Sequence, residues 1–125
     1  MGTKYGNTVT CESSAIKIYT RYYNDKHNQL MIGSTSKLIN FTPYSSVSII
    51  ISNTPSCQYT GSFDVRGSNE NSLAYIGVTK NTTSEKTYTI SLSGINVSGY
   101  LDISPLSTLN TDCGATWYVH KIWFT

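Results

Sequence analysis

Charged side chains are scarce in this sequence. They make up 13% of the 125 residues, and the formal net charge of +2 comes from isolated lysines and arginines with no run among them. A protein that binds nucleic acid needs a dense cationic surface to neutralise phosphates. The composition therefore predicts no nucleic-acid partner.

Long apolar stretches are missing too. No run approaches the roughly 20 apolar residues that a membrane-spanning helix requires, and no signal peptide precedes the first predicted strand. We therefore expect a soluble chain that does not insert into membranes, whether whole or cut from a longer protein. Its 125 residues suffice for one domain whose core needs no metal or disulfide support.

Cysteine occurs only three times, as Cys11, Cys57 and Cys113. Their spacing contains no CxxC element, which argues against a zinc site. At most one internal disulfide can form, and a Cys57–Cys113 bond is conceivable. Free thiols are favoured, because nothing else in the sequence marks an oxidising compartment.

What the sequence does contain is tyrosine, with 10 residues, and many serines, threonines and asparagines. This composition is typical of β-rich proteins with polar, uncharged outer faces. The pattern is clearest in residues 85–104, where apolar and hydroxyl side chains alternate on either side of a turn at residues 94–99. We predict a hairpin in a half-buried antiparallel sheet. Its apolar face comprises Tyr88, Ile90, Leu92, Leu101 and Ile103.

Alternation of this kind recurs along the chain from residue 15 onward. Residues 67–72, GSNENS, are predicted to close a second hairpin, and Pro43 places its region at a sheet edge. Residues 1–13 show no periodicity, so we expect a flexible leading segment or cloning remnant there and a single domain over residues 14–125. The further predicted strands are residues 15–23, 30–32, 38–41, 47–51, 59–66, 73–80 and 116–124.

About eight short strands without a convincing helix predict an all-β fold, a two-sheet antiparallel β-sandwich best matched by a jelly roll. An immunoglobulin-like sandwich is the alternative. Both tryptophans, Trp117 and Trp123, follow the last cysteine. The Cys, Trp, Cys order of antibody domains is therefore absent, and the jelly roll is favoured.

Residues 46–125 resemble the jelly-roll modules of phage tail and baseplate proteins and the carbohydrate-binding modules of the galactose-binding-like type. The matching stretches are SVSIIIS, FDVRGSNENSLAYIGV, YTISLSG, SGYLDIS and YVHKIWF. The resemblance implies adhesion to a surface glycan or a cell-surface protein, or a place on a viral tail, and hence an extracellular, cell-surface or virion location. We expect no cofactor. Such families often hold a structural calcium, but the acidic residues here match no ligand set, and Asp102 alone is insufficient.

Groups that could carry catalysis are dispersed. The nearest pair of the seven acidic residues, Asp64 and Glu70, fits an outward strand residue beside a hairpin-loop residue. A Ser-His-acid triad would use His27 or His120, but no GxSxG motif presents a serine. We expect His27 to be solvated in a loop and His120 to be a partly buried or edge histidine, and we predict that the protein is not an enzyme.

Aromatic side chains are the most informative surface feature, because flat ring faces stack on sugars while neighbouring polar groups supply hydrogen bonds. If Ile16 and Ile18 belong to the core, Tyr19, Arg21 and Tyr23 project from the opposite face. This aromatic, basic, aromatic stripe is the first candidate for ligand binding.

The last strand allows two assignments. If Ile122 and Phe124 are core residues, Trp117, Lys121 and Trp123 face outward, whereas the reverse assignment buries both tryptophans. First and last strands commonly neighbour each other in jelly rolls, so the two stripes are predicted to merge into one platform.

Two further residues extend the predicted site. Tyr100 joins the platform if its strand lies in the same sheet, and Arg66 with the loop at residues 67–72 forms a second candidate, because ligands often bind at loop ends. The predicted ligand-binding residues are Tyr19, Arg21, Tyr23, Arg66, Tyr100 and Trp117. The alternative is that these rings are cross-strand packing pairs or contact a neighbouring subunit.

These features favour a non-catalytic recognition or adhesion module that binds a surface glycan, from a phage tail or a bacterial surface protein. Two alternatives stay open. A protein-binding module would have a broader and flatter aromatic face. A structural viral tail domain would bury the same stripe against its own copies in a trimer or larger homo-oligomer.

Overall fold

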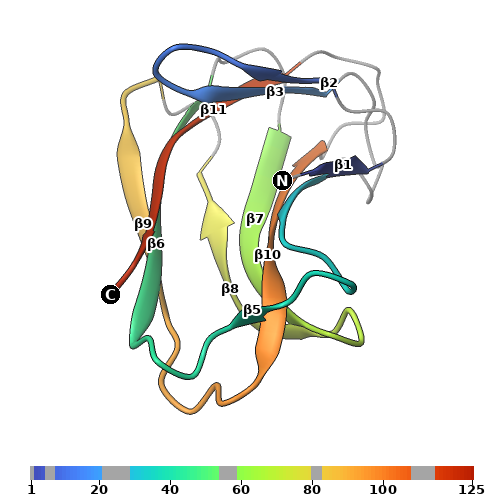
Figure 1. Cartoon of the computed structure of the whole chain (residues 1–125). Helices are drawn as coiled ribbons and strands as arrows, with labels where there is room; N and C mark the ends of the chain where they lie inside the picture. Colours follow the sequence, from blue (N-terminus) through green and yellow to red (C-terminus); the bar gives the residue numbers. More distant parts are fainter. Residues whose placement is uncertain (1, 5–7, 21–28, 54–58, 80–82, 108–114) are drawn as a thin grey trace.

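The computed structural model describes residues 2–4, 8–20, 29–53, 59–79, 83–107 and 115–125. These residues form eleven strands and no helix, so none of them builds a helix that could cross a membrane. The strands make two antiparallel sheets, which confirms the predicted all-β sandwich. In Figure 1 the five-stranded sheet runs down the left side and bends over the top, and the six-stranded sheet occupies the centre and right.

Each sheet mixes strands from distant parts of the chain. The six-stranded sheet has the order β1 (Gly2–Lys4), β4 (Gln29–Ile32), β10 (Ser98–Ser107), β7 (Tyr59–Gly67) and β8 (Ser72–Val78), with β5 (Ile39–Asn40) paired to β10. The five-stranded sheet has the order β2 (Thr8–Cys11), β3 (Ile16–Thr20), β11 (Ala115–Phe124), β6 (Ser46–Asn53) and β9 (Lys86–Ser91).

The core lies between the sheets and follows the alternation in the sequence. On β6, Val47, Ile49 and Ile51 are at most 1% exposed, and the residues between them, Ser48 and Ile50, face outward because successive side chains of a strand point to opposite sides. The same rule places Phe63 and Val65 of β7 inward, where both are fully buried. Burial of these side chains is the main stabilisation of such a fold, at roughly 25 cal/mol per Å² of apolar surface.

Residues 85–104 do not form the predicted hairpin, because their two strands belong to different sheets. β9 pairs with β6 in one sheet and β10 pairs with β7 and β4 in the other, so the chain crosses between the sheets at one end of the sandwich (Figure 1). In this crossover, Gly94 has a φ of +82° and the Ile95 N–H donates to the Leu92 carbonyl at 2.9 Å. The predicted faces are right, because all five apolar residues of that stretch are at most 5% exposed.

The hairpin at residues 67–72 is confirmed. β7 pairs with β8, and the Gly67 N–H donates to the Asn71 carbonyl at 2.9 Å. Glu70 adopts a φ of +67° in the turn, a left-handed conformation that non-glycine residues seldom take. The chain therefore reverses within this loop and carries β8 back along β7.

Within residues 1–13, predicted as a flexible leading segment, the structure has two strands. β1 pairs with β4 and β2 pairs with β3. Both strands are short and rich in threonine, and each lies at an edge of its sheet, where apolar alternation is not required. They raise the strand number above the predicted eight.

The ambiguity in the last strand has a structural cause. The register of β11 against β6 shifts at His120, which forms a β-bulge. Before the bulge Trp117 and Val119 face inward and are 1% and 3% exposed. After it, Ile122 and Phe124 pack against the core. Each of the two sequence assignments is therefore correct for one half of the strand.

Candidate functional site

Outward-facing residues align across three neighbouring strands of the six-stranded sheet. Asp102 of β10 lies opposite Asp64 of β7, and Asp64 lies opposite Tyr75 of β8. Directly opposed residues of antiparallel strands share a face, with Cβ atoms about 5 Å apart. Asp102 is 0%, Asp64 5% and Tyr75 71% exposed. The row therefore runs from a buried pair of carboxylates to an open aromatic ring.

The guanidinium of Arg66 joins the two carboxylates. Its Nε donates to Asp102 Oδ2 at 2.9 Å and its Nη2 donates to Asp64 Oδ2 at 2.7 Å. Its Nη1 donates to the backbone carbonyl of Glu70 at 2.9 Å, which fixes the third side of the guanidinium. The Ser104 hydroxyl donates to Asp102 Oδ1, also at 2.9 Å. One cation thus faces two acids, and its planar fork suits this bridging geometry.

Burial sets the protonation chemistry of this cluster. Loss of solvent raises the pKa of the Asp102 carboxyl above its ordinary value of 3.8, and the nearby Asp64 charge acts in the same direction, against the lowering by Ser104 and Arg66. Asp64 Oδ1 is buried and accepts no hydrogen bond from the described residues. A buried acceptor without a donor is costly, so a water molecule or a ligand hydroxyl would stabilise it.

Beside this cluster, the outer side of β8 is open. Leu73 is 40% exposed and, two residues on, Tyr75 shares its face. Gly77 continues the line opposite Ser62, and a Cβ added to Gly77 would meet no atom within 4 Å. Glycine inside a strand often marks a place where another molecule approaches closely. We name this surface the Tyr75 face and define it by Ser62, Asp64, Arg66, Leu73, Tyr75 and Gly77.

Of the described residues that the sequence predicted to bind ligand, the structure places Arg66 and Tyr100 opposite each other on β7 and β10 and separates them from Tyr19. Arg66 lies on the Tyr75 face, and Tyr19 lies on the outer side of the five-stranded sheet with 39% of its surface exposed. Arg21 and Tyr23 lie outside the described residues. The prediction that Trp117 and Tyr100 present rings to a ligand is wrong for both residues.

The prediction for Trp117 is wrong because this residue precedes the bulge in β11 and therefore faces the core. The ring crosses the interior toward β7, where only a glycine fits: a Cβ at Gly61 would overlap the Trp117 ring. Tyr100 is 3% exposed and belongs to β10 in the six-stranded sheet, so it also cannot join a platform with Tyr19.

A second aromatic surface exists on the five-stranded sheet. As predicted, the first stripe and the last strand are neighbours, because β3 pairs with β11 and Tyr19 lies opposite Thr116. Lys121 and Trp123 face the same side further along β11, with the Lys121 ammonium 4.9 Å from the Trp123 ring centroid. Trp123 is only partly exposed, and the lysine covers its ring. The most exposed of the described rings on this surface, Tyr19, is 39% exposed, against 71% for Tyr75.

His120 contacts a serine and an acid that the sequence did not connect to it. Its Nε2 is 2.8 Å from Ser52 Oγ, and its Nδ1 is 3.4 Å from Glu85 Oε1. A nucleophile that contacts a base, which in turn contacts an acid, is the arrangement found in acyl-transfer enzymes. Ser52, however, is only 8% exposed near the end of β6, and its hydroxyl is occupied by the contact with His120. The arrangement fits the partly buried histidine that the sequence predicted.

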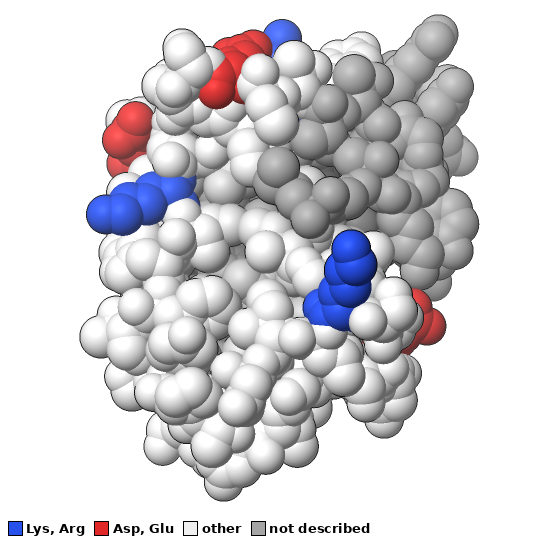
Figure 2. Space-filling model, in the orientation of Figure 1, with Lys and Arg blue, Asp and Glu red and all other residues white. Residues whose placement is uncertain are grey.

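The remaining sequence predictions concern metals, thiols and charge. Within the described ranges no group of three His, Cys, Asp or Glu side chains could hold a metal ion, and the carboxylates of Asp64 and Asp102 both pair with Arg66. Cys11 is a free, exposed thiol, whereas Cys57 and Cys113 lie outside the described residues. Figure 2 shows the described charges scattered singly over the face in view.

Sequence reasoning missed Tyr75 and Gly77, although both positions were visible in the pattern. The predicted strand at residues 73–80 places Tyr75 and Gly77 on the same side by simple alternation, so a ring beside a glycine follows from the pattern. The Asp64–Asp102 pair could not be found in this way. It depends on β10 lying next to β7, a pairing between strands that are more than thirty residues apart in the chain.

Comparison with known structures supports the fold. One family 29 carbohydrate-binding module, a variant in which a lysine is replaced by alanine, superimposes with a TM-score of 0.60 at 10% identity, covering 95% of this chain and 76% of that one. A variant with a tyrosine replaced has a TM-score of 0.57 at 12% identity, with coverages of 97% and 78%. A further family 29 module has a TM-score of 0.55 at 14% identity, with coverages of 98% and 75%.

No family model and no curated protein matches the chain. At these identities the likeness concerns the fold alone. It confirms that the chain has the jelly-roll sandwich of a carbohydrate-binding module, as the resemblance of residues 46–125 implied. The phage-tail part of that resemblance stays a prediction.

Proposed function

We propose that this protein is a non-catalytic glycan-recognition module that binds carbohydrate on the Tyr75 face. The observation that carries the proposal is the Tyr75 ring, 71% exposed beside the carboxylate and guanidinium cluster and next to the open position at Gly77. A sugar has an apolar ring face that stacks on an aromatic side chain and hydroxyl groups that bond to charged groups at its rim. Both kinds of partner lie side by side here.

The structural likeness supports the same reading. The similar solved structures are carbohydrate-binding modules, and those carrying substitutions of lysine, tyrosine, arginine or aspartate are described as probes of the mechanism of ligand recognition. Tyrosine, arginine and aspartate are also the residue types on the Tyr75 face. A module of this kind works where polysaccharide is exposed, so the proposal includes an extracellular, cell-surface or virion location, on a phage tail or a bacterial surface protein.

A glycan array tests the proposal, followed by calorimetry on the oligosaccharide that binds best. Tyr75→Ala is expected to weaken binding about tenfold or more, because the stacking partner is lost. Gly77→Val is expected to abolish it, since the added side chain occupies the open position beside the ring. Neither change should unfold the protein, because Tyr75 is exposed and the Gly77 position has free space.

Tyr19→Ala is the matched control, because it removes an exposed tyrosine from the other sheet. We expect it to leave glycan binding unchanged. If Tyr19→Ala weakens binding and Tyr75→Ala does not, the proposed face is wrong. If no glycan binds and sedimentation shows a trimer or larger assembly, the structural alternative replaces the glycan proposal.

A further inference from the structure

β11 has a strand partner along only part of one edge. On one side it pairs with β6 from residue 117 to residue 124, and on the other side it pairs with β3 from residue 115 to residue 119. Beyond residue 119, none of the described residues pairs with β11 on the β3 side. Alternate residues of the segment 120–124 therefore direct their N–H and C=O groups toward a strand position that the described part of the chain does not fill.

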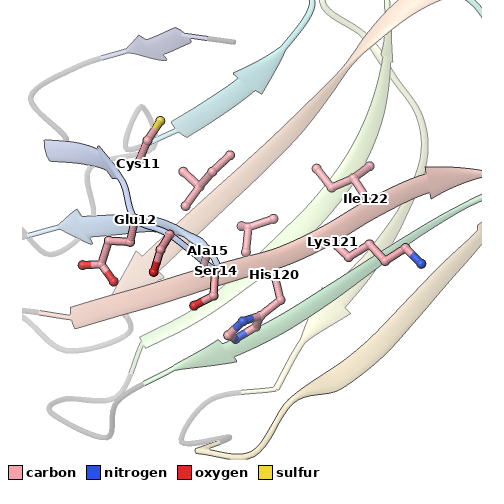
Figure 3. A pocket seen from close by; sticks show the side chains of 10 residues that line it. Cys11, Glu12, Ser14, Ala15, His120, Lys121 and Ile122 are labelled. Atoms are coloured by element: carbon pink, nitrogen blue, oxygen red, sulfur yellow. The ribbon is translucent and has the colours of Figure 1, made fainter.

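The turn between β2 and β3 closes one end of this vacancy. β3 begins at Ile16, and the Glu12 N–H donates to the Ala15 carbonyl at 2.9 Å just before it. A hollow of about 390 Å³ lies between this turn and β11. In Figure 3 Ile122 stands above β11, away from Ser14 and Ala15 of the turn, whereas the His120 imidazole lies below β11 on the β6 side, where Ser52 contacts it.

The hollow has an apolar interior that the protein leaves partly uncovered. Its apolar lining comprises Ala15, Ile16, Val119 and Ile122. Ile16 and Ile122 pack against the core but are only partly buried. A strand placed beside residues 120–124 would cover both, since every second side chain of that strand would point inward between the sheets.

Lys121 lies on the outer side of the same segment, whereas Glu12 lines the hollow at the turn. Lys121 is exposed and makes no ion pair with the described residues. Its neighbour on this face is the Trp123 ring, 4.9 Å from the ammonium. An outward side chain of an added strand would lie next to Lys121, where a carboxylate is favoured.

We propose that residues 120–124 of β11 bind an extended peptide segment, with apolar residues at alternate positions and an acidic residue between them, by adding a strand to the five-stranded sheet. Backbone hydrogen bonds supply affinity in this mode of recognition, and alternate side chains supply specificity. A second copy of this chain is a poorer occupant. It would bring two Lys121 side chains onto the same short segment, and the bulge at His120 interrupts the continuous ladder that self-pairing uses. This proposal is independent of glycan binding on the Tyr75 face.

The test uses an acetylated and amidated hexapeptide, Val-Thr-Val-Glu-Val-Thr, added to the ¹⁵N-labelled full chain. We expect chemical-shift changes at residues 120–124 and at the β2–β3 turn, and slower hydrogen exchange of the amides that gain a partner. Two further peptides carry N-methyl groups on either the odd or the even residues. Because a strand pairs through one edge only, one of the two is expected to bind and the other is not.

Charge variants test the predicted acidic preference. Replacing the glutamate of the peptide by lysine is expected to weaken binding to the wild-type protein about threefold. The Lys121→Glu protein is expected to prefer the lysine peptide over the glutamate peptide. Lys86→Glu makes the same charge change on β9, away from the hollow, and is expected to leave the order unchanged.

Three results would overturn the proposal. The first is the absence of shift changes with millimolar peptide. The second is equal binding of both methylated peptides, which indicates apolar adhesion without strand pairing. The third is protection of residues 120–124 that rises with protein concentration in the absence of peptide, together with dimers in sedimentation, which identifies a second copy as the occupant.

Discussion

Arg66 is the residue on which the Tyr75 face depends most. Its guanidinium is the shared partner of two carboxylates, one of them fully buried. Without it, two acids would lie side by side in a site of low dielectric constant, and loss of one partner from a buried ionic group destabilises proteins by about 3–5 kcal/mol. Because the Arg66 side chain is 26% exposed, we expect the loss at the lower end of this range. Arg66→Ala should reduce the free energy of unfolding by about 3 kcal/mol.

Denaturant unfolding of Arg66→Ala and Arg66→Lys measures this effect. Lysine restores the charge but not the fork that reaches both acids, so we expect Arg66→Lys to recover only part of the lost free energy of unfolding. Equal stability of wild type and Arg66→Ala would show that the guanidinium bridge has no structural role.

Asp102 makes stability depend on pH in a direction opposite to that of most carboxylates. Its folded pKa is raised above 3.8 by burial, so the folded state holds the proton more tightly than the unfolded state. The resulting stabilisation is fully present below the unfolded pKa and is lost as pH rises through the folded pKa. Relative to Asp102→Asn, the wild type is therefore expected to become more stable as pH falls from neutral to about 4.

Urea unfolding of both proteins at several pH values measures that difference. The Asn variant cannot ionise, so other titrating groups largely cancel in the comparison. A difference that stays constant, or that favours the variant at low pH, would contradict the assignment of a raised pKa to Asp102.

At the scale of strands, two glycines on the paired strands β7 and β8 have opposite roles. A Cβ at Gly61 of β7 would overlap the Trp117 ring and the Ser104 carbonyl, whereas a Cβ at Gly77 of β8 would meet nothing within 4 Å. We expect Gly61→Ala to destabilise the protein by about 2 kcal/mol through overpacking. Gly77→Ala is expected to stabilise it by about 0.5 kcal/mol, because glycine in a strand is entropically costly.

Thermal unfolding of the two alanine variants provides the comparison, and each serves as the control of the other. A stable Gly61→Ala protein would mean that Trp117 does not cross the core toward β7. A destabilised Gly77→Ala protein would mean that the position is required by the backbone and is not kept open for a ligand.

The strands also show what the sequence could and could not predict. Alternation correctly assigned Tyr88, Ile90 and Leu101 to the core, because the apolar side of an alternating strand is the buried side. It could not distinguish β9 and β10 as partners in one sheet from strands that face each other across the core, since both give the same pattern. It also could not show the bulge at His120, which inverts the faces of β11 without any change in composition.

For the molecule as a whole, the sandwich was predictable and the site was largely not. The sequence placed an aromatic platform on the first and last strands, and β3 and β11 are indeed neighbours. The carboxylate pair with Arg66 depends on pairings between distant strands, which no local pattern reports. The two sheets thus carry two separate surfaces, the Tyr75 face on one and the vacant edge of β11 on the other.

Glycan binding on the Tyr75 face is tested by an NMR titration of the ¹⁵N-labelled protein with the oligosaccharide that binds best on the array. Binding there is expected to give the largest amide shifts at Asp64, Arg66, Tyr75 and Gly77, with residues 120–124 unaffected. Shifts centred on Tyr19 and Trp123, or no shifts with any glycan, would contradict it.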